Sequence, residues 1–172
     1  MMGYFYFLFT MKILMVCLGN ICRSPLAEGI LRKKAAEYAL NIEVDSAGFE
    51  YCNKGMSPDL RSVEVAQKHG VDINDIRSRM FEYSDFLHFD KIYVMDRYNY
   101  NDVMSMAQTE QDKSKVKYIL DEVYPGENRS IKDPYYGGKD GFTTVYNQLD
   151  EACEAICRRM ITERNFLINI VD

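Results

Sequence analysis

The most constraining feature of this sequence is a short loop that joins an apolar run to a helix start near the amino end of the chain. Residues 12–16, Lys-Ile-Leu-Met-Val, are typical of a buried strand. Ser24 and Pro25 are typical of a helix start, with serine as the N-cap and proline at the first helical position. A strand that passes through a short loop into a helix predicts a unit of an α/β fold.

The loop itself is suited to hold a phosphate-like dianion. Gly19 and Asn20 tolerate positive φ, and a loop of this kind turns several backbone N–H groups toward one point. The helix N-terminus adds its own N–H groups, and the planar guanidinium of Arg23 matches phosphate oxygens. The predicted lining of this cradle is Leu18, Gly19, Asn20, Ile21, Cys22 and Ser24.

Cys17 stands at the base of the cradle, where it is the candidate nucleophile. The helix N-terminus and Arg23 both favour a thiolate, which is the reactive form of cysteine. A loop that only held phosphate would gain nothing from an anionic sulfur, so we expect Cys17 to attack phosphorus. The structural alternative is an inert, buried cysteine at a strand end. A Walker-type nucleotide loop is excluded because no Gly-Lys-Ser/Thr follows the glycine.

The segment from Cys17 to Pro25 resembles the signature of the low-molecular-weight protein tyrosine phosphatases, and the similarity runs from Lys12 to about Met160. Residues 133–137, Asp-Pro-Tyr-Tyr-Gly, are similar to the segment that carries this family's general acid. The resemblance implies hydrolysis of aryl phosphate monoesters through a phosphocysteine intermediate, with phosphotyrosine-containing proteins as partners and no cofactor. It also implies that inorganic phosphate or other oxyanions bind in the loop.

The second motif supplies Asp133 as general acid and then general base. A tyrosine leaves poorly as an anion at neutral pH, and a carboxylic acid at the bridging oxygen removes that barrier. The structural alternative is an ordinary Asp-Pro turn. Tyr135 and Tyr136 would form an aromatic wall for a substrate ring, or only pack the loop. The resemblance implies that one of them lines the cleft and that both can be phosphorylated.

Three further residues have two interpretations each. Ser24 caps the helix, and its hydroxyl could also face Cys17 and assist its departure. Cys22 is either a small buried residue or the thiol that captures an oxidised Cys17 as a disulfide. Asp96 either orders the phosphate loop or caps the helix that follows it.

The chain departs from the family at two positions. Cys52 occupies the place where the family usually has tryptophan or tyrosine, and Phe49 or Tyr51 would have to supply the missing ring. Ile76 stands where a histidine often precedes the Ser78-Arg79 pair. The substrate-facing wall and the hydrogen bonds behind the loop are therefore expected to be built differently.

Strand and helix patterns alternate along the chain, which predicts an α/β fold with a parallel sheet. We expect a single-domain three-layer sandwich, in which a four-stranded parallel sheet has helices on both faces and the phosphate-binding loop follows the first strand. The expected strands are 12–16, 42–46, 91–95 and 116–120, and the expected helices are 24–40, 58–69, 98–107 and 142–163, with a helical turn at 83–88. Residues 121–141 are expected to be loop.

Residues 11–165 are interpreted as the phosphatase domain and residues 166–172 as a C-terminal tail. Residues 1–10 are aromatic and apolar, but they lack a positive region and a small-residue cleavage site. We interpret them as an N-terminal extension, explicable by a mis-assigned start codon, because Met11 resembles the family's usual start. The functional alternative is a segment that adheres to a membrane or a partner.

Composition narrows the partners and the compartment. The net charge of -5, with acidic and basic residues interleaved, argues against nucleic acid. The apolar runs are too short for a membrane span, so no membrane contact is expected. The chain has only two histidines, both remote from the cysteines, so no metal site is expected. A reactive thiol that must stay reduced fits a cytoplasmic protein.

A phosphate-binding loop of this kind also occurs with three other functions, and particular residues of this chain argue against each of them. Protein arginine phosphatases share the fold, but that branch tends to carry threonine where this chain has Ile21. Arsenate reductases coupled to thioredoxin need a relay of cysteines near the third strand, and none lies between Cys52 and Cys153. A non-catalytic phosphate-binding adaptor would be expected to lack the nucleophile or the acid, and both are present.

Overall fold

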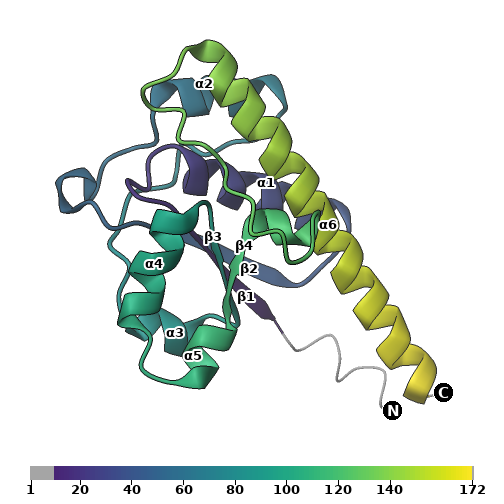
Figure 1. Cartoon of the computed structure of the whole chain (residues 1–172). Helices are drawn as coiled ribbons and strands as arrows, with labels where there is room; N and C mark the ends of the chain where they lie inside the picture. The colour runs from purple at the N-terminus through teal and green to yellow at the C-terminus, as the bar shows by residue number, and fades with distance from the viewer. Residues whose placement is uncertain (1–9, 172) are drawn as a thin grey trace.

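The computed structural model describes residues 10–171, so residues 1–9, most of the expected N-terminal extension, lie outside the described part. Figure 1 shows a central sheet between two layers of helices. The four strands are β1 (Met11–Val16), β2 (Ile42–Ala47), β3 (Lys91–Val94) and β4 (Val116–Tyr118). The helices are α1 (Arg23–Glu37), α2 (Leu60–Lys68), α3 (Ser84–His88), α4 (Arg97–Met106), α5 (Glu110–Ser114) and α6 (Lys139–Val171). Two 3₁₀ turns complete the list, η2 (Tyr51–Asn53) and η3 (Ile119–Glu122).

The sheet is entirely parallel, with the strand order β2-β1-β3-β4, which confirms the predicted architecture. Alternate residues of β1 enter different cores, because Ile13 and Met15 pack with α1 and α6 while Leu14 and Val16 pack toward α3 and α4. A strand covered on both faces has to be apolar throughout. This explains why the run at 12–16 does not alternate with polar residues.

The register brings the carboxyl ends of three strands to one edge of the sheet. Val16 pairs with Ala47 on β2 and with Val94 on β3. Ligands of open parallel sheets bind beyond this edge. Cys17 follows Val16 directly, so the candidate loop lies where the topology places a site.

Several element boundaries differ from the sequence expectations. Helix α1 begins at Arg23, so Ser24 is not its N-cap and Pro25 is not at its first position; Cys22 takes the N-cap place without a side-chain hydrogen bond. The same helix ends at Glu37 instead of Leu40. Helix α2 was expected from Pro58, but it begins after Asp59, whose carboxylate accepts the Arg61 N–H. The helix α5 and the turn η3 were not predicted.

The last helix is longer than its expected end near Glu163. It runs to Val171, and Val145, Leu149, Ala152 and Ile156, which recur every three or four residues, form a stripe that is buried against α1 and the sheet. None of the helices within residues 10–171 combines the length and the apolar character needed to cross a bilayer.

Candidate active site

The loop between β1 and α1 folds around the Cys17 sulfur. The backbone N–H of Asn20 donates to Cys17 Sγ at 3.3 Å. Asn20 has φ 51°, the left-handed conformation that the sequence predicted. Gly19 has a different role from the one expected, because it is not among the residues with positive φ. A Cβ on Gly19 would lie 2.8 Å from the Asn53 amide nitrogen, so the glycine permits close contact with the neighbouring loop.

The hydroxyl of Ser24 lies 3.0 Å from Cys17 Sγ. Asn20 Nδ2 donates to Ser24 Oγ and to Ser46 Oγ, both at 2.9 Å, while its Oδ1 accepts the Arg79 backbone N–H at 2.9 Å. Because both amide hydrogens of Asn20 point at hydroxyls, Ser24 accepts from Asn20 and keeps its own hydrogen for the Cys17 sulfur. The second interpretation of Ser24, a hydroxyl that faces Cys17, is therefore the one that the geometry supports.

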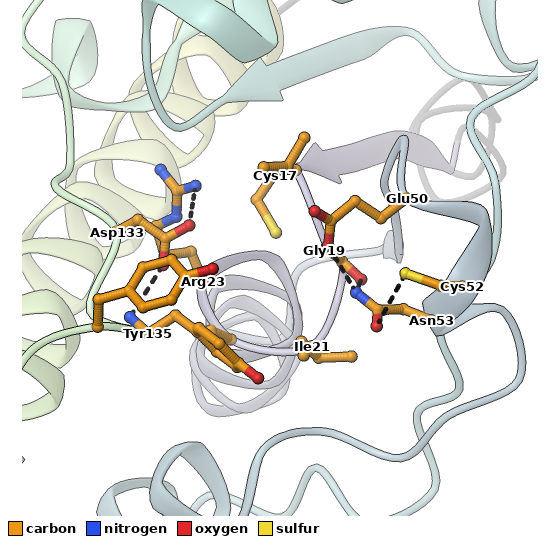
Figure 2. Close-up of a pocket in the computed structure, with 12 residues that line it drawn as sticks. Cys17, Gly19, Ile21, Arg23, Glu50, Cys52, Asn53, Asp133 and Tyr135 are labelled. Carbon is orange, nitrogen blue, oxygen red and sulfur yellow. Dashed lines mark hydrogen bonds and ion pairs between the residues drawn. The ribbon is translucent and has the colours of Figure 1, made fainter.

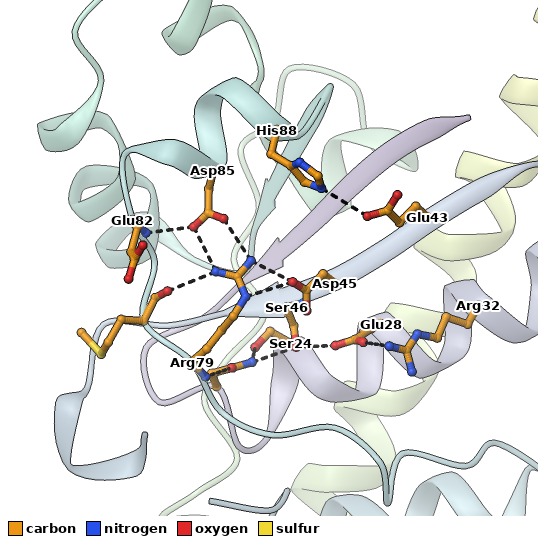
Figure 3. Close-up of polar contacts among 12 residues, drawn as sticks. Ser24, Glu28, Arg32, Glu43, Asp45, Ser46, Arg79, Glu82, Asp85 and His88 are labelled. Atoms are coloured by element: carbon orange, nitrogen blue, oxygen red, sulfur yellow. Dashed lines mark hydrogen bonds and ion pairs between the residues drawn. The ribbon is translucent and has the colours of Figure 1, made fainter. Parts of the chain in front are cut away.

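A buried carboxyl group continues this chain of hydrogen bonds behind the loop (Figure 3). Ser46 Oγ donates to Glu28 Oε2 at 2.5 Å, and Glu28 also forms an ion pair with Arg32. Glu28 is 1% exposed, and this burial raises its pKa to about 7 against the lowering effects of Ser46 and Arg32. Ile76, at the family's histidine position, is itself buried in the core and adds no hydrogen bond here.

Arg23 is held between two carboxylates. Its Nη1 donates to Asp96 Oδ2 at 2.5 Å and to the Ile131 carbonyl at 3.0 Å, and its Nη2 donates to Asp133 Oδ2 at 2.9 Å. Burial alone would lower its pKa, but the negative charges of Cys17, Asp96 and Asp133 raise it above the usual value. Arg23 Nε is buried and has no hydrogen-bond partner among the described residues, so it keeps a donor for an oxyanion.

Asp96 has both of the functions that the sequence left open. It caps α4 by accepting the Asn99 N–H at 2.9 Å, and its other oxygen holds Arg23. One carboxylate thus fixes a helix start and the guanidinium of the phosphate loop together.

Asp133 reaches the loop from the segment between η3 and α6. Its Oδ2 accepts from Arg23, and its Oδ1 accepts the Tyr135 N–H at 3.0 Å. Asp133 and Cys17 line the same cavity of about 210 Å³, although they are distant in the sequence (Figure 2). The structure therefore brings together the proposed nucleophile, phosphate clamp and acid.

The mouth of the cavity has two unlike walls. Tyr135 and Tyr136 stand on one side with ring centroids 5.0 Å apart, while Glu50, Cys52 and Asn53 line the other. Neither ring proposed to replace the missing aromatic does so. The ring of Phe49 stacks on Phe81 at 5.4 Å, and Tyr51 is exposed outside the cavity lining.

Cys22 lines the same cavity and is 4% exposed. Burial, followed by the negative charges of Asp59, Cys17 and Asp133, raises the pKa of the Cys22 thiol to about 12. Cys153 and Cys157 are buried in the core beneath α1, where they fill space. Within residues 10–171, no three His, Cys, Asp or Glu side chains form a cluster that could hold a metal ion.

Four polar residues support the site although the sequence did not predict that role for them, namely Glu28, Ser46, Asn53 and Arg61. Only Ser46 and Arg61 had a local signal. Ser46 follows an aspartate at the end of an expected strand, and Arg61 lies near the expected helix start at Pro58. Glu28 had no local signal, because a glutamate within a helix is normally assigned to the solvent face, whereas α1 is buried on all sides from Arg23 to Leu31.

Comparisons with known proteins agree with this geometry. The family model of low molecular weight phosphotyrosine protein phosphatases matches residues 12–165. A putative low molecular weight protein-tyrosine-phosphatase of Synechocystis is 41% identical over 83% of this chain and 92% of its own length. The human low molecular weight phosphotyrosine protein phosphatase is 36% identical over 87% of this chain and 96% of its own length.

Solved structures give the same result. A protein tyrosine phosphatase of Entamoeba histolytica, with Hepes in its active site, superimposes with a TM-score of 0.82 at 36% identity and covers 90% of this chain and 99% of its own. A Drosophila arginine phosphatase superimposes with a TM-score of 0.81 at 34% identity and covers 87% of this chain and 98% of its own. The loop from Cys17 to Ser24, the parallel sheet behind it and these matches all show that the chain belongs to the low molecular weight phosphotyrosine protein phosphatase family.

Proposed function

We propose that this protein hydrolyses phosphotyrosine in proteins through a phosphocysteine intermediate. The observation that carries the proposal is the single cavity lined by Cys17, Arg23 and Asp133. A nucleophile, a cation for the phosphoryl oxygens and a carboxyl group for the leaving oxygen are the three groups that this reaction needs. We assign the activity to residues 11–165 and treat residues 1–10 and 166–172 as an extension and a tail.

In the first step, Cys17 Sγ attacks phosphorus in line with the ester oxygen. The S–P bond forms as the P–O bond to the phenol breaks, and Asp133 gives its proton to the departing oxygen. Arg23 and the loop N–H groups bind the equatorial oxygens, where negative charge is spread in the transition state. The products of this step are a free tyrosine hydroxyl and a phosphocysteine.

In the second step, the Asp133 carboxylate takes a proton from a water molecule that attacks phosphorus. The S–P bond breaks, and the sulfur leaves as a thiolate that accepts the Ser24 hydroxyl hydrogen at the 3.0 Å seen here. Inorganic phosphate is then released. The residue assignments used in these steps are Cys17 as nucleophile, Arg23 as clamp and Asp133 as acid and then base.

Four loop residues, Leu18, Gly19, Ile21 and Cys22, line the cavity and surround the phosphoryl group in this proposal. Asn20 and Ser24 are not in its lining, and they support the loop through their contacts with Cys17 Sγ. Tyr135, 43% exposed, and Tyr136, 96% exposed, form the wall against which a substrate ring would pack.

Arginine phosphatase activity is the second candidate, favoured by the similarity to the Drosophila enzyme. Ile21 argues against it. This side chain packs against the core and lines the cavity, so it narrows the pocket with an apolar group at the place where the arginine-specific branch tends to have threonine. The flat ring of a phosphotyrosine can pack against the apolar Ile21 side chain, whereas the guanidinium group of a phosphoarginine requires hydrogen-bond acceptors there.

A direct assay separates the candidates. Peptides of one sequence that carry phosphotyrosine or phosphoarginine at the same position are offered to the wild type and to Cys17→Ser. We expect phosphate release from the phosphotyrosine peptide by the wild type and none by Cys17→Ser. A higher kcat/KM for the phosphoarginine peptide would replace the proposal with the second candidate.

The compartment follows from the thiol chemistry. All five cysteines lie within the described residues and are free thiols. A nucleophile that works as a thiolate needs a reducing environment, so we propose a cytoplasmic location. Phosphotyrosine-containing proteins are the proposed partners.

A further inference from the structure

We infer that Glu50 makes the enzyme select phosphotyrosine that has a lysine or arginine beside it in the substrate chain. This inference rests on the proposed function, because it names the class of protein segment that the same site accepts. The cavity mouth has unlike walls, because Tyr135 lies across from Glu50, Cys52 and Asn53.

The Glu50 carboxylate is fixed against the phosphate loop. Asn53 Nδ2 donates to Glu50 Oε2 at 2.8 Å and to the Gly19 carbonyl at 3.2 Å, so one amide joins the carboxylate to the loop. The Glu50 backbone N–H donates to the Leu18 carbonyl at 3.2 Å. A Cβ built on Gly19 would lie 3.0 Å from Glu50 Oε2, which shows how near the carboxylate is to the cradle.

This carboxylate has no cation of its own among the described side chains, since its side-chain hydrogen bond there comes from the neutral Asn53 amide. The cavity-lining cation, Arg23, is already paired with Asp96 and Asp133. The mouth therefore presents an exposed negative charge next to the place where a phosphate dianion must bind. Two like charges at close range repel each other, so Glu50 weakens the binding of phosphoesters that bring no positive charge.

A positive charge on the substrate reverses this effect. With the phosphorylated ring against Tyr135, the residues before and after it in the substrate pass over the mouth, where Glu50 stands on the opposite side. A lysine or arginine there would pair with a carboxylate that Asn53 already holds in position, so little side-chain freedom is lost on pairing. The missing family aromatic at Cys52 leaves this side open to a charged side chain.

The test uses two phosphotyrosine peptides that differ at one residue next to the phosphotyrosine, arginine in one and glutamine in the other. The kcat/KM ratio of the pair is measured for the wild type, for Glu50→Gln and for Glu110→Gln. Glu110 is exposed on α5, which precedes β4 and so lies at the opposite end of the sheet from Cys17, and its replacement changes the net charge equally. Each measurement is made at about 0.05 M and at about 0.5 M salt.

We expect the wild type and Glu110→Gln to prefer the arginine peptide by about two- to fivefold at low salt, the range of an exposed ion pair. In Glu50→Gln the ratio should fall to about one, mainly because the glutamine peptide is hydrolysed faster. High salt should reduce the wild-type ratio. Equal ratios in the wild type and Glu50→Gln would overturn the inference while leaving the proposed function intact, whereas failure to hydrolyse either peptide would overturn the function itself.

Discussion

Arg61 on α2 donates a hydrogen bond of 3.0 Å to the backbone carbonyl of Tyr135, the residue that stands two positions after Asp133. The guanidinium also lies 4.5 Å from the centroid of the Phe142 ring at the start of α6, and Asp59 holds it in place through two hydrogen bonds. The first turn of α2 thus fixes the segment that carries the proposed acid. The contact joins two elements that are more than 70 residues apart in the chain, and no local pattern predicts it.

Replacing Arg61 with alanine is expected to lower kcat by about 10- to 100-fold, because the acid then loses its fixed position relative to the ester oxygen. The loss should be smaller for an activated aryl phosphate, whose leaving group needs no proton. Arg158→Ala removes an exposed arginine from α6 and serves as the matched control. Equal losses for both kinds of substrate would mean that Arg61 affects folding and not the acid.

Asp133→Ala is expected to slow hydrolysis of phenyl phosphate by about 10² to 10⁴, the usual contribution of a general acid. The loss should shrink as the pKa of the leaving phenol falls. A series of substituted aryl phosphates measures this dependence for the wild type and the variant. If the two slopes are the same, another group donates the proton.

Cys22 is expected to protect the nucleophile from irreversible oxidation. Peroxide converts the Cys17 thiolate to a sulfenic acid, and the Cys22 thiol then displaces water from it to form a disulfide. Since the pKa of Cys22 is about 12, this closure should become faster as the pH rises. Activity recovered with dithiothreitol after brief peroxide treatment is compared for the wild type and Cys22→Ser, with the Cys17–Cys22 peptide sought by mass mapping. Equal recovery without that peptide would leave Cys22 as a packing residue.

Glu28 should make stability depend on pH in an unusual direction. Burial raises its pKa from 4.5 to about 7, so the folded state holds a proton that the unfolded state has lost. The protonated Glu28 carboxyl therefore contributes about 3 kcal/mol to the free energy of unfolding. This contribution is fully present below about pH 4.5 and disappears as the pH rises through about 7. Arg32, Asp45 and Asp75 also act on this carboxyl, so the observable is the difference in unfolding free energy between the wild type and Glu28→Gln.

The difference in unfolding free energy is measured by urea titration at several pH values. Between about pH 4.5 and 7.5 it should change by up to about 3 kcal/mol, with the wild type losing stability relative to Glu28→Gln as the pH rises. A difference that stays constant with pH would show that Glu28 keeps its ordinary ionisation in the folded protein. A substitution at the exposed Glu64 on α2 provides the surface control.

The sheet and the phosphate loop were predictable because their signals are local. The apolar run at 12–16 and Asn20 each act on their own backbone, and the expected strand and left-handed asparagine are confirmed. The role of Gly19 was not predictable in this way, because it depends on contact with Asn53. The end of α6 was predicted too early, even though residues 164–171 contain neither glycine nor proline to stop a helix. The error came from following the core-facing stripe instead of the helix propensity.

The proximity of Cys17 and Asp133 could not be predicted from the sequence, because it depends on the path of the long loop from η3 to α6. The start of α1 was beyond it for a related reason. Ser24 is a good N-cap residue, but the N-cap lies two residues earlier at Cys22, and the helix begins at Arg23, whose side chain is held by Asp96 and Asp133. Tertiary contacts of a buried guanidinium outweigh a capping preference of about 1 kcal/mol.

The ion pair between Arg23 and Asp133 means that the enzyme carries its own competitor for phosphate. In the proposed mechanism, a phosphoryl group that enters the cradle has to share Arg23 with Asp133 or displace it, and the displacement would free Asp133 to turn toward the leaving oxygen. After the second step the same carboxylate is ready to return to the guanidinium and so help inorganic phosphate to depart. Inorganic phosphate should then inhibit the enzyme only weakly, because the Asp133 carboxylate competes with it for the Arg23 guanidinium.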